Sequence, residues 1–302
     1  MIECFLAELP HGITLSCRAA GAVKAPLLLF LHGFPEGAFV WDALLSHFAG
    51  RYRCVAPNLR GYERSSAPSE VEAYRVKHLV ADIEALIGHC NRAAGRAQAA
   101  PLEALIAHDW GGAVAWSFAV QRREWLQRLV IVNSPHPATF LRELQHSPAQ
   151  QSASAYMNFL CRPDAAALLA ANDFARLWPF LTGRGGDAAA WLTEAVKAQY
   201  RAVWGAGLQG GLNYYRASPL RPPTPDDRSL LTLEFPPEFV TILVPTLVIW
   251  GEADIALPPT LLDGLGAYVP RMRLVRVPEA THWIVHEQPG RVAHEIEASL
   301  RA

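Results

Sequence analysis

The chain has 302 residues, of which 51% are hydrophobic and 18% are charged, a balance typical of a compact globular protein. Its formal net charge of −1 and the lack of any lysine- or arginine-rich run argue against nucleic acid or an anionic membrane as a partner. The five scattered cysteines contain no CxxC pair and predict neither a disulfide framework nor a zinc site. Free thiols and the absence of a signal-peptide pattern predict a cytoplasmic location.

The elements expected in chain order describe an α/β protein. CFLAEL and ITLSCRAA predict an antiparallel hairpin, and near-continuous apolar runs then predict buried parallel strands. Helix-like stretches separate the first four of these runs, as in a doubly wound sheet. The expected strands are 28–33, 52–58, 102–109, 128–134, 246–251 and 272–278, and the expected helices are 37–48, 77–90 and 111–122. Together they predict an eight-stranded, mostly parallel sheet.

The alternation stops after the sixth strand. Residues 135–240 are rich in alanine and helix-like, and they end in the proline-dense segments SPLRPPTPDD and EFPPEF, which exclude regular helix and central strand. We therefore expect a core domain from residues 1–134 and 241–302, with 135–240 inserted as a helical cap. A cap in this position lies over the carboxyl ends of the strands, where ligands bind in open α/β sheets.

The stretch IAHDWGG places an aspartate, Asp109, between a buried strand and a helix. Ala107 and Gly111 are the small neighbours that a tight turn carrying a nucleophile requires. A carboxylate at a helix start is also a common helix cap, and this stretch alone leaves both interpretations open.

Three other segments favour a nucleophile. Asp254 follows one buried strand and His282 follows the next, which gives the order nucleophile, acid, base along the chain. The LHGFP loop follows the first long strand, where an N–H group for an oxyanion hole belongs. The main-chain N–H groups of Phe34 and Trp110 are the candidate donors.

HGFPE, NLRGYERSSAP, HDWGG, GEADIAL and EATHWIVHEQP together resemble the epoxide hydrolases of the α/β-hydrolase superfamily, over about residues 11 to 295. The resemblance implies an α/β-hydrolase fold with a helical lid after strand 6. It also assigns the epoxide-activating tyrosines to Tyr156 in QSASAYMNFL and to Tyr215 in GLNYYRASPL. Tyr214 is expected to point elsewhere.

The implied reaction opens an epoxide by carboxylate attack and releases a vicinal diol after hydrolysis of the ester. The expected partners are a small-molecule epoxide and water, with Phe34, Pro35 and Trp110 binding the substrate, and no cofactor or metal is implied. A homo-oligomer is left open. Ala107, Glu63 and Thr281 stand where the family has glycines, and these departures alter loop shape without removing a chemical group.

Other classes remain as alternatives. A haloalkane dehalogenase would hold halide with two ring N–H groups, or with one and an asparagine where this chain has Phe34. Trp110 and one lid tryptophan (Trp178, Trp191 or Trp204) could still serve. A haloacetate dehalogenase would have arginine in place of Trp110. A non-catalytic small-molecule binder on the same fold is less favoured, and the lack of a G-x-S-x-G motif excludes a serine esterase.

Two motifs are discounted. GAGLQG (205–210) has the glycine spacing of a dinucleotide site but follows helical sequence in place of a strand. These glycines are expected to form the hinge before the Tyr215 helix. His282 and His286 have the spacing of a helical metal pair, but the glutamate of HExxH is missing.

Overall fold

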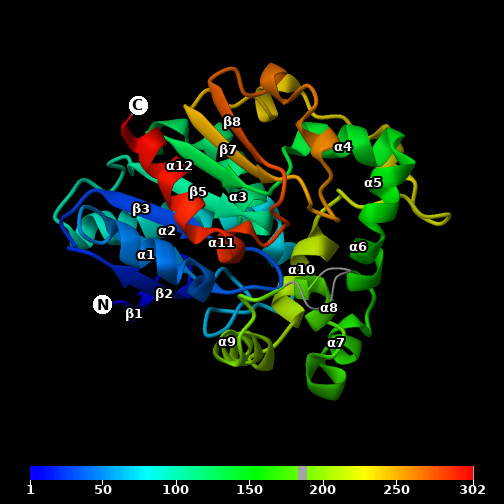
Figure 1. The fold of residues 1–302 in the computed structure, drawn as a ribbon, viewed down its shortest axis with the longest axis horizontal. Coiled ribbons are helices and arrows are strands. Elements are labelled where there is room, and N and C mark those ends of the chain that lie inside the picture. Colours follow the sequence, from blue (N-terminus) through cyan, green and yellow to red (C-terminus); the bar gives the residue numbers. More distant parts are fainter. Residues whose placement is uncertain (183–188, 302) are drawn as a thin grey trace.

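The computed structural model describes residues 1–182 and 189–301. An eight-stranded sheet in the order β1-β2-β4-β3-β5-β6-β7-β8 forms its centre (Figure 1). β2 runs antiparallel to both β1 and β4, and the remaining neighbours are parallel, which confirms the mostly parallel sheet. The strands are β1 (Glu3–Glu8), β2 (Thr14–Ala20), β3 (Leu27–Leu31), β4 (Arg53–Pro57), β5 (Ala104–His108), β6 (Leu129–Val132), β7 (Thr246–Gly251) and β8 (Met272–Val277).

Burial follows the position of each strand in the sheet. Every residue of β3, β5, β6 and β7 is buried, because helices cover both faces of these central strands. The expectation of a fully buried strand is wrong for β8, where Arg273 and Arg276 are exposed. β8 forms the edge of the sheet, and an edge strand commonly carries charged side chains.

Helices pack on both faces of the sheet, with α1 beside α12 and α2 beside α3 (Figure 1). The helix predicted at 37–48 is divided: a 3₁₀ turn covers Ala38–Trp41 and α1 begins at Asp42. The helix predicted from 111 begins two residues earlier, at Asp109 itself. These helices are α1 (Asp42–Phe48), α2 (Val76–Ala93), α3 (Asp109–Gln121), α11 (Ile284–Glu287) and α12 (Pro289–Arg301).

In the described parts of the segment between β6 and β7, seven further α-helices lie beside the sheet in Figure 1. They are α4 (Pro137–His146), α5 (Pro148–Ala153), α6 (Ala155–Leu160), α7 (Ala165–Phe174), α8 (Trp178–Thr182), α9 (Glu194–Gly205) and α10 (Gln209–Ala217). The proline-dense return to β7 contains only short 3₁₀ turns, at Ser229–Thr232 and Pro237–Phe239. Within the described ranges, no helix has both the length and the apolar character needed to cross a bilayer.

Glu63 is the residue at which the resemblance implied a glycine. Its φ is +50°, in the left-handed region that residues with a side chain rarely adopt. The carboxylate accepts hydrogen bonds from Ser16 Oγ and Asn58 Nδ2, each 2.6 Å long. These bonds hold the turn in the glycine-like conformation although a side chain is present.

Candidate active site

Asp109 lies at the junction of β5 and α3. The strand ends at His108 and the helix begins at the next residue, so the chain turns without an intervening loop. The φ of Asp109 is +50°, the strained conformation expected of a residue at a nucleophile elbow. The helix-cap interpretation does not match this geometry: the cap position belongs to His108, and no side chain caps this helix start.

Two glycines after Asp109 allow α3 to approach the sheet. A Cβ atom on Gly111 would lie 2.5 Å from the carbonyl oxygen of Leu31, and one on Gly112 would lie 2.3 Å from Cβ of Ser134. Neither position has room for a side chain. The turn is held further by Ser134, whose hydroxyl donates a hydrogen bond to the carbonyl oxygen of Asp109 at 2.6 Å.

The carboxylate of Asp109 meets the loop after β3. The main-chain N–H of Phe34 donates a hydrogen bond of 2.7 Å to Oδ1 of Asp109. A Cβ atom on Gly33 would lie only 2.1 Å from the same oxygen, so this loop needs glycine for the approach. Trp110 is the second residue of α3, where N–H groups have no acceptor inside the helix. Both predicted oxyanion donors therefore belong to main chain next to the carboxylate.

Asp254 and His282 form a close pair beside Asp109. Nδ1 of His282 lies 2.6 Å from Oδ2 of Asp254, and Nε2 lies 3.7 Å from Oδ2 of Asp109. The other oxygen of Asp254 accepts main-chain N–H bonds from Ala256 and Leu257, both 2.9 Å long. Asn133 Nδ2 adds a bond of 2.9 Å to Oδ2 of Asp254. The acid is thus fixed and turned toward the histidine.

Charge decides the protonation of this pair. Burial by itself lowers the pKa of His282, but the carboxylates of Asp254 and Asp109 outweigh burial and raise the pKa to about 9. Burial would raise the pKa of Asp254, yet His282 and Asn133 hold it below its ordinary value. At neutral pH the pair is an imidazolium beside a carboxylate, as long as Asp109 is charged.

Both predicted tyrosines reach the same region from the helices between β6 and β7. Tyr156 comes from α6 and Tyr215 from α10, with ring centroids 6.2 Å apart. Burial, followed by the charge of Asp109 for Tyr156 and by Tyr156 and Asp109 for Tyr215, raises the pKa of both phenols. The phenols therefore stay protonated. Tyr214 points away, because its hydroxyl donates to the carbonyl oxygen of Arg60 at 2.9 Å.

A cavity of about 830 Å³ opens at this point. Its described wall is mainly apolar and aromatic, and it carries no lysine or arginine. The lining residues are Phe34, Asp109, Ala149, Ser152, Ala153, Tyr156, Pro179, Phe180, Leu181, Thr182, Ala189, Trp191, Tyr215, Ala253, Asp254, Ile255, Ala256, Thr281, His282, Trp283 and Glu287.

The structure separates the three residues expected to bind substrate. Phe34 lines the cavity, whereas Trp110 and Pro35 lie behind the described wall. Trp110 packs edge-on against Tyr215, with ring centroids 5.0 Å apart. The carbonyl oxygen of Pro35 accepts a 2.6 Å hydrogen bond from Trp204 Nε1. Trp110 therefore contacts the wall through Tyr215, whereas Pro35 bonds to Trp204, which is not among the lining residues.

A buried polar network beneath the cavity was missed at the sequence level. Glu36, entirely enclosed, contacts His108 Nδ1 and His286 Nε2, both at 3.1 Å. Tyr200 in α9 donates to Glu36 at 3.0 Å. Burial would raise the pKa of Glu36, but the two histidines hold it far below its ordinary value. The sequence feature that could have indicated this network is Glu36, the charged residue that follows Phe34 and Pro35 in the HGFPE motif.

His108 connects this network to the base. Its Nε2 lies 2.9 Å from the carbonyl oxygen of His282, and its Nδ1 faces Glu36. His108 thus joins the Glu36 network to the main chain of the loop that carries His282. His286 contacts Glu36 and Tyr200, whereas His282 pairs with Asp254, so the two histidines do not share a metal-ligand geometry.

The glycines of GAGLQG lie at the junction of α9 and α10. Gly207 has a φ of +133°, and a Cβ atom on Gly210 would lie 2.3 Å from Cα of Gly61. The stretch connects two helices instead of following a strand, so the context of a dinucleotide-binding loop is missing. The glycines serve the turn and the close approach to Gly61.

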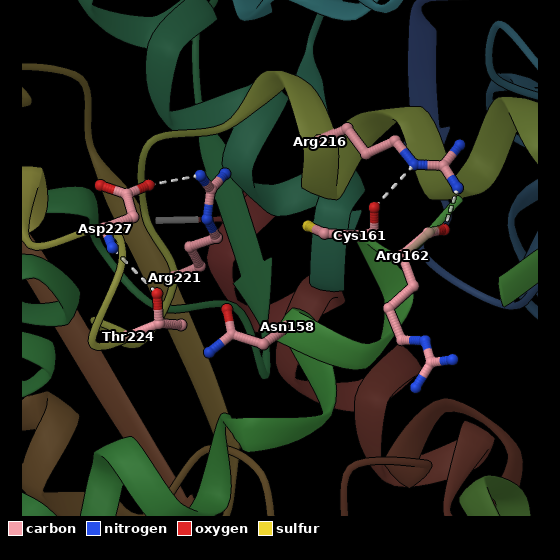
Figure 2. A pocket seen from close by; sticks show the side chains of 7 residues that line it. All are labelled: Asn158, Cys161, Arg162, Arg216, Arg221, Thr224 and Asp227. Atoms are coloured by element: carbon pink, nitrogen blue, oxygen red, sulfur yellow. Dashed lines mark hydrogen bonds and ion pairs between the residues drawn. The ribbon is translucent and has the colours of Figure 1, made fainter. Parts of the chain in front are cut away.

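A second cavity, of about 390 Å³, contains none of the predicted site residues (Figure 2). Arg216 spans it and donates to the carbonyl oxygens of Cys161 and Arg162, and Arg221 pairs with Asp227 at 2.7 Å. The guanidinium groups are thus occupied by the protein itself. The catalytic candidates all face the first cavity.

The sheet and the elbow define the class of protein. Residues 26–289 match the family described as the alpha/beta hydrolase fold. This match covers most of the chain, and the chain is therefore an α/β hydrolase.

Relatives identify the branch within that class. The chain is 34% identical over 298 residues to epoxide hydrolase 3 of Xenopus tropicalis, covering 96% of this chain and 75% of that protein. It is 33% identical over 306 residues to epoxide hydrolase 4 of Mus musculus, covering 99% and 79%. A mutant epoxide hydrolase of Bacillus megaterium, solved with its product, a naphthyloxy-propane-1,2-diol, is similar with a TM-score of 0.87. That match has 31% identity and covers 99% of this chain and 100% of the other. The chain belongs to the epoxide hydrolase family of enzymes.

Proposed function

We propose that this enzyme adds water to an epoxide and releases a vicinal diol through a covalent ester on Asp109. The observation that carries the proposal is the convergence of one carboxylate, one acid–base pair and two phenols on a single cavity. Asp109, His282, Asp254, Tyr156 and Tyr215 all line it.

In the first step, an oxygen of Asp109 attacks one epoxide carbon while the carbon–oxygen bond of the ring breaks. The released alkoxide takes a proton from Tyr156 or Tyr215, whose raised pKa values keep the phenols protonated until that moment. The product is a hydroxyalkyl ester. Its formation removes the negative charge of Asp109, and the pKa of His282 falls because one of its stabilising charges is gone.

In the second step, His282 becomes the base. Its proton returns to the phenolate, and the neutral ring, oriented by Asp254, removes a proton from water. The resulting hydroxide attacks the ester carbonyl of Asp109, and the N–H groups of Phe34 and Trp110 hold the oxyanion. When this tetrahedral intermediate collapses, the bond between the Asp109 carbonyl carbon and the diol oxygen breaks. The leaving diol oxygen takes the remaining proton of the attacking water. Asp109 is then a carboxylate again and His282 an imidazolium.

The tryptophans argue against halide as the leaving group. A dehalogenase needs free ring N–H groups at the cavity, but Trp178 donates to Asp173 O and Trp204 donates to Pro35 O. Among these three tryptophans only Trp191 lines the described cavity, where it stacks on His286 at a centroid distance of 4.2 Å, so no pair of them offers two ring N–H groups there. The described wall also has no lysine or arginine to bind the carboxylate of a haloacetate, and Glu287 would repel that carboxylate. An uncharged substrate suits this wall best.

The size and lining of the cavity indicate a bulky, apolar epoxide, such as one bearing an aryl group. We propose further that residues 135–240 act as the lid over a core of residues 1–134 and 241–302. The lid would supply the phenols through Tyr156 and Tyr215, and the core would supply the carboxylates and the base. This division places proton donors and nucleophile on opposite sides of the substrate.

A single turnover of styrene oxide in oxygen-18 water, with enzyme in excess, tests the proposal. Attack on the ester carbonyl leaves the label on the peptide containing Asp109, and the diol carries an oxygen that came from the carboxylate. Label in the diol with none on Asp109 would show direct attack by water. Halide release from chloroalkanes without diol formation from epoxides would overturn the assignment of substrate.

A further inference from the structure

The base loop, residues 278–283, connects β8 to α11 and carries His282. Directly before the base, Thr281 makes two hydrogen bonds to one carboxylate. Its main-chain N–H donates to Oε2 of Glu287 at 2.8 Å, and its hydroxyl donates to Oε1 at 2.6 Å. The same hydroxyl accepts the N–H of Trp283 at 3.2 Å. Glu287 therefore closes a ring of bonds around the base loop.

We propose that Glu287, acting through Thr281, is a positioning residue for His282 during hydrolysis of the ester. The inference rests on the proposed function, because it assigns a role in the second step of that reaction. The hydroxyl of Thr281 provides the second bond to Glu287, in addition to the main-chain N–H that any residue other than proline would offer. The side chain of Thr281 thus adds a second hydrogen bond that holds the loop carrying His282.

Three contacts fix His282 from different directions. Asp254 holds the ring at Nδ1, His108 holds the main-chain carbonyl at 2.9 Å, and Glu287 holds the preceding residue. On the opposite side, a Cβ atom on Gly251 would lie 2.4 Å from the carbonyl oxygen of Thr281, so the loop packs directly on the end of β7. Without Glu287, Thr281 would lose both bonds to the carboxylate, and the loop would be free to shift on that side of His282.

Ester formation and ester hydrolysis depend differently on the bonds between Glu287 and Thr281. Asp109 is fixed by its elbow and by Phe34, whereas the side-chain bonds of Thr281 and Glu287 join these two residues to each other and to Trp283. Attack on the epoxide therefore does not need the base loop in place. Hydrolysis does, because Nε2 of His282 must direct a water molecule at the ester carbonyl, and small displacements of a catalytic group are costly.

Glu287→Ala tests the inference by transient kinetics with styrene oxide. We expect ester formation at the wild-type rate and hydrolysis slower by about ten- to a hundredfold. Slower breakdown of the intermediate lowers kcat and KM together and leaves kcat/KM unchanged. A variant with a generally damaged fold would instead have a lower kcat/KM. An unchanged kcat/KM with a lower kcat therefore indicates a positioning role for Glu287.

Three further variants show whether the hydrogen bonds of Glu287, and not its charge, determine the rate of hydrolysis. Glu287→Gln can still accept the Thr281 N–H and donate to the hydroxyl, and we expect hydrolysis near the wild-type rate. Thr281→Val removes only the hydroxyl bond and should slow hydrolysis less than Glu287→Ala. Gln288→Ala is the matched control, because its exposed 3.2 Å bond to Glu279 spans the same loop without touching Thr281. It should hydrolyse the ester normally.

Two results would overturn the inference: unchanged hydrolysis in Glu287→Ala, or equal slowing in Glu287→Gln, which would assign the effect to charge. If Glu287→Ala does not fold, as judged by thermal unfolding, Thr281→Val decides the question by the same rates. Absence of any ester in the wild-type enzyme would instead refute the proposed function. The two failures are therefore distinguishable.

Discussion

Nε2 of His282 faces Oδ2 of Asp109 across 3.7 Å. This separation is too long for a hydrogen bond, yet it is short enough for the two charges to influence each other. In the proposed mechanism, His282 would therefore respond to the chemical state of Asp109: the free carboxylate stabilises the imidazolium, and an ester at Asp109 would remove that stabilisation.

Replacing His282 by glutamine should separate the two steps. Ester formation needs only Asp109 and the phenols, whereas hydrolysis needs the base, so His282→Gln is expected to hydrolyse the ester about a thousandfold more slowly. Mass spectrometry of the intact variant after incubation with styrene oxide should show the mass of one substrate added at Asp109. Asp109→Ala serves as the control and should gain no mass and form no diol. An unmodified His282→Gln variant that still produces no diol would contradict the two-step scheme.

The raised pKa of His282 also predicts how stability depends on pH. The pKa is about 9 in the folded protein and about 6.5 in an unfolded chain, so the folded state binds the proton more tightly. The resulting stabilisation is fully present below about pH 6.5 and is lost as the pH rises through about 9. Urea unfolding of wild type and His282→Gln should therefore give a difference in unfolding free energy that decreases from about pH 6 to about pH 9.5. A difference that stays constant would contradict the assigned pKa.

Tyr156 in α6 and Tyr215 in α10 are expected to share one task, the stabilisation of the alkoxide. Tyr156→Phe and Tyr215→Phe should each slow ester formation by about ten- to a hundredfold, because the remaining phenol still stabilises the alkoxide. The double variant should lose more than either, by rapid-quench measurement of the ester. Tyr214→Phe is the matched control: it removes the bond to Arg60 O, costs about 1 kcal/mol of stability and leaves ester formation unchanged. Loss of activity in Tyr214→Phe alone would reassign the role.

The meeting of the candidate carboxylates and the candidate base could be predicted because each of these residues follows a strand. The carboxyl ends of parallel strands meet at one edge of a sheet, so strand order alone brings Asp109, Asp254 and His282 together. The same argument located the loop of Phe34. Within this part of the molecule, the topology of the sheet determines which residues meet.

The remaining features of the site depend on how the helices pack, and the hydrophobic periodicity of the sequence does not specify that packing. Glu36 meets Tyr200 only because α9 lies over the loop after β3, and the sequence does not specify that placement. In α7, Asn172 and Asp173 adopt left-handed conformations in the middle of a helical pattern. The cavity wall contributed by the helices between β6 and β7 could therefore not be predicted from the sequence, whereas the meeting of Asp109, Asp254 and His282 could.

The last prediction concerns Gly111, because α3 approaches the sheet too closely at this residue for a side chain. An alanine at Gly111 would place Cβ 2.5 Å from Leu31 O, and main chain cannot move aside as a flexible side chain can. We expect Gly111→Ala to cost about 1–3 kcal/mol of unfolding free energy and to displace Asp109 from Phe34, with loss of ester formation. Gly290→Ala is the matched control, because a Cβ atom there meets nothing within 4 Å. It should leave activity unchanged and add about 0.5–1 kcal/mol of stability. Urea unfolding and single-turnover rates measure both effects. A Gly111→Ala variant as stable and active as wild type would show that the elbow tolerates a side chain at this position.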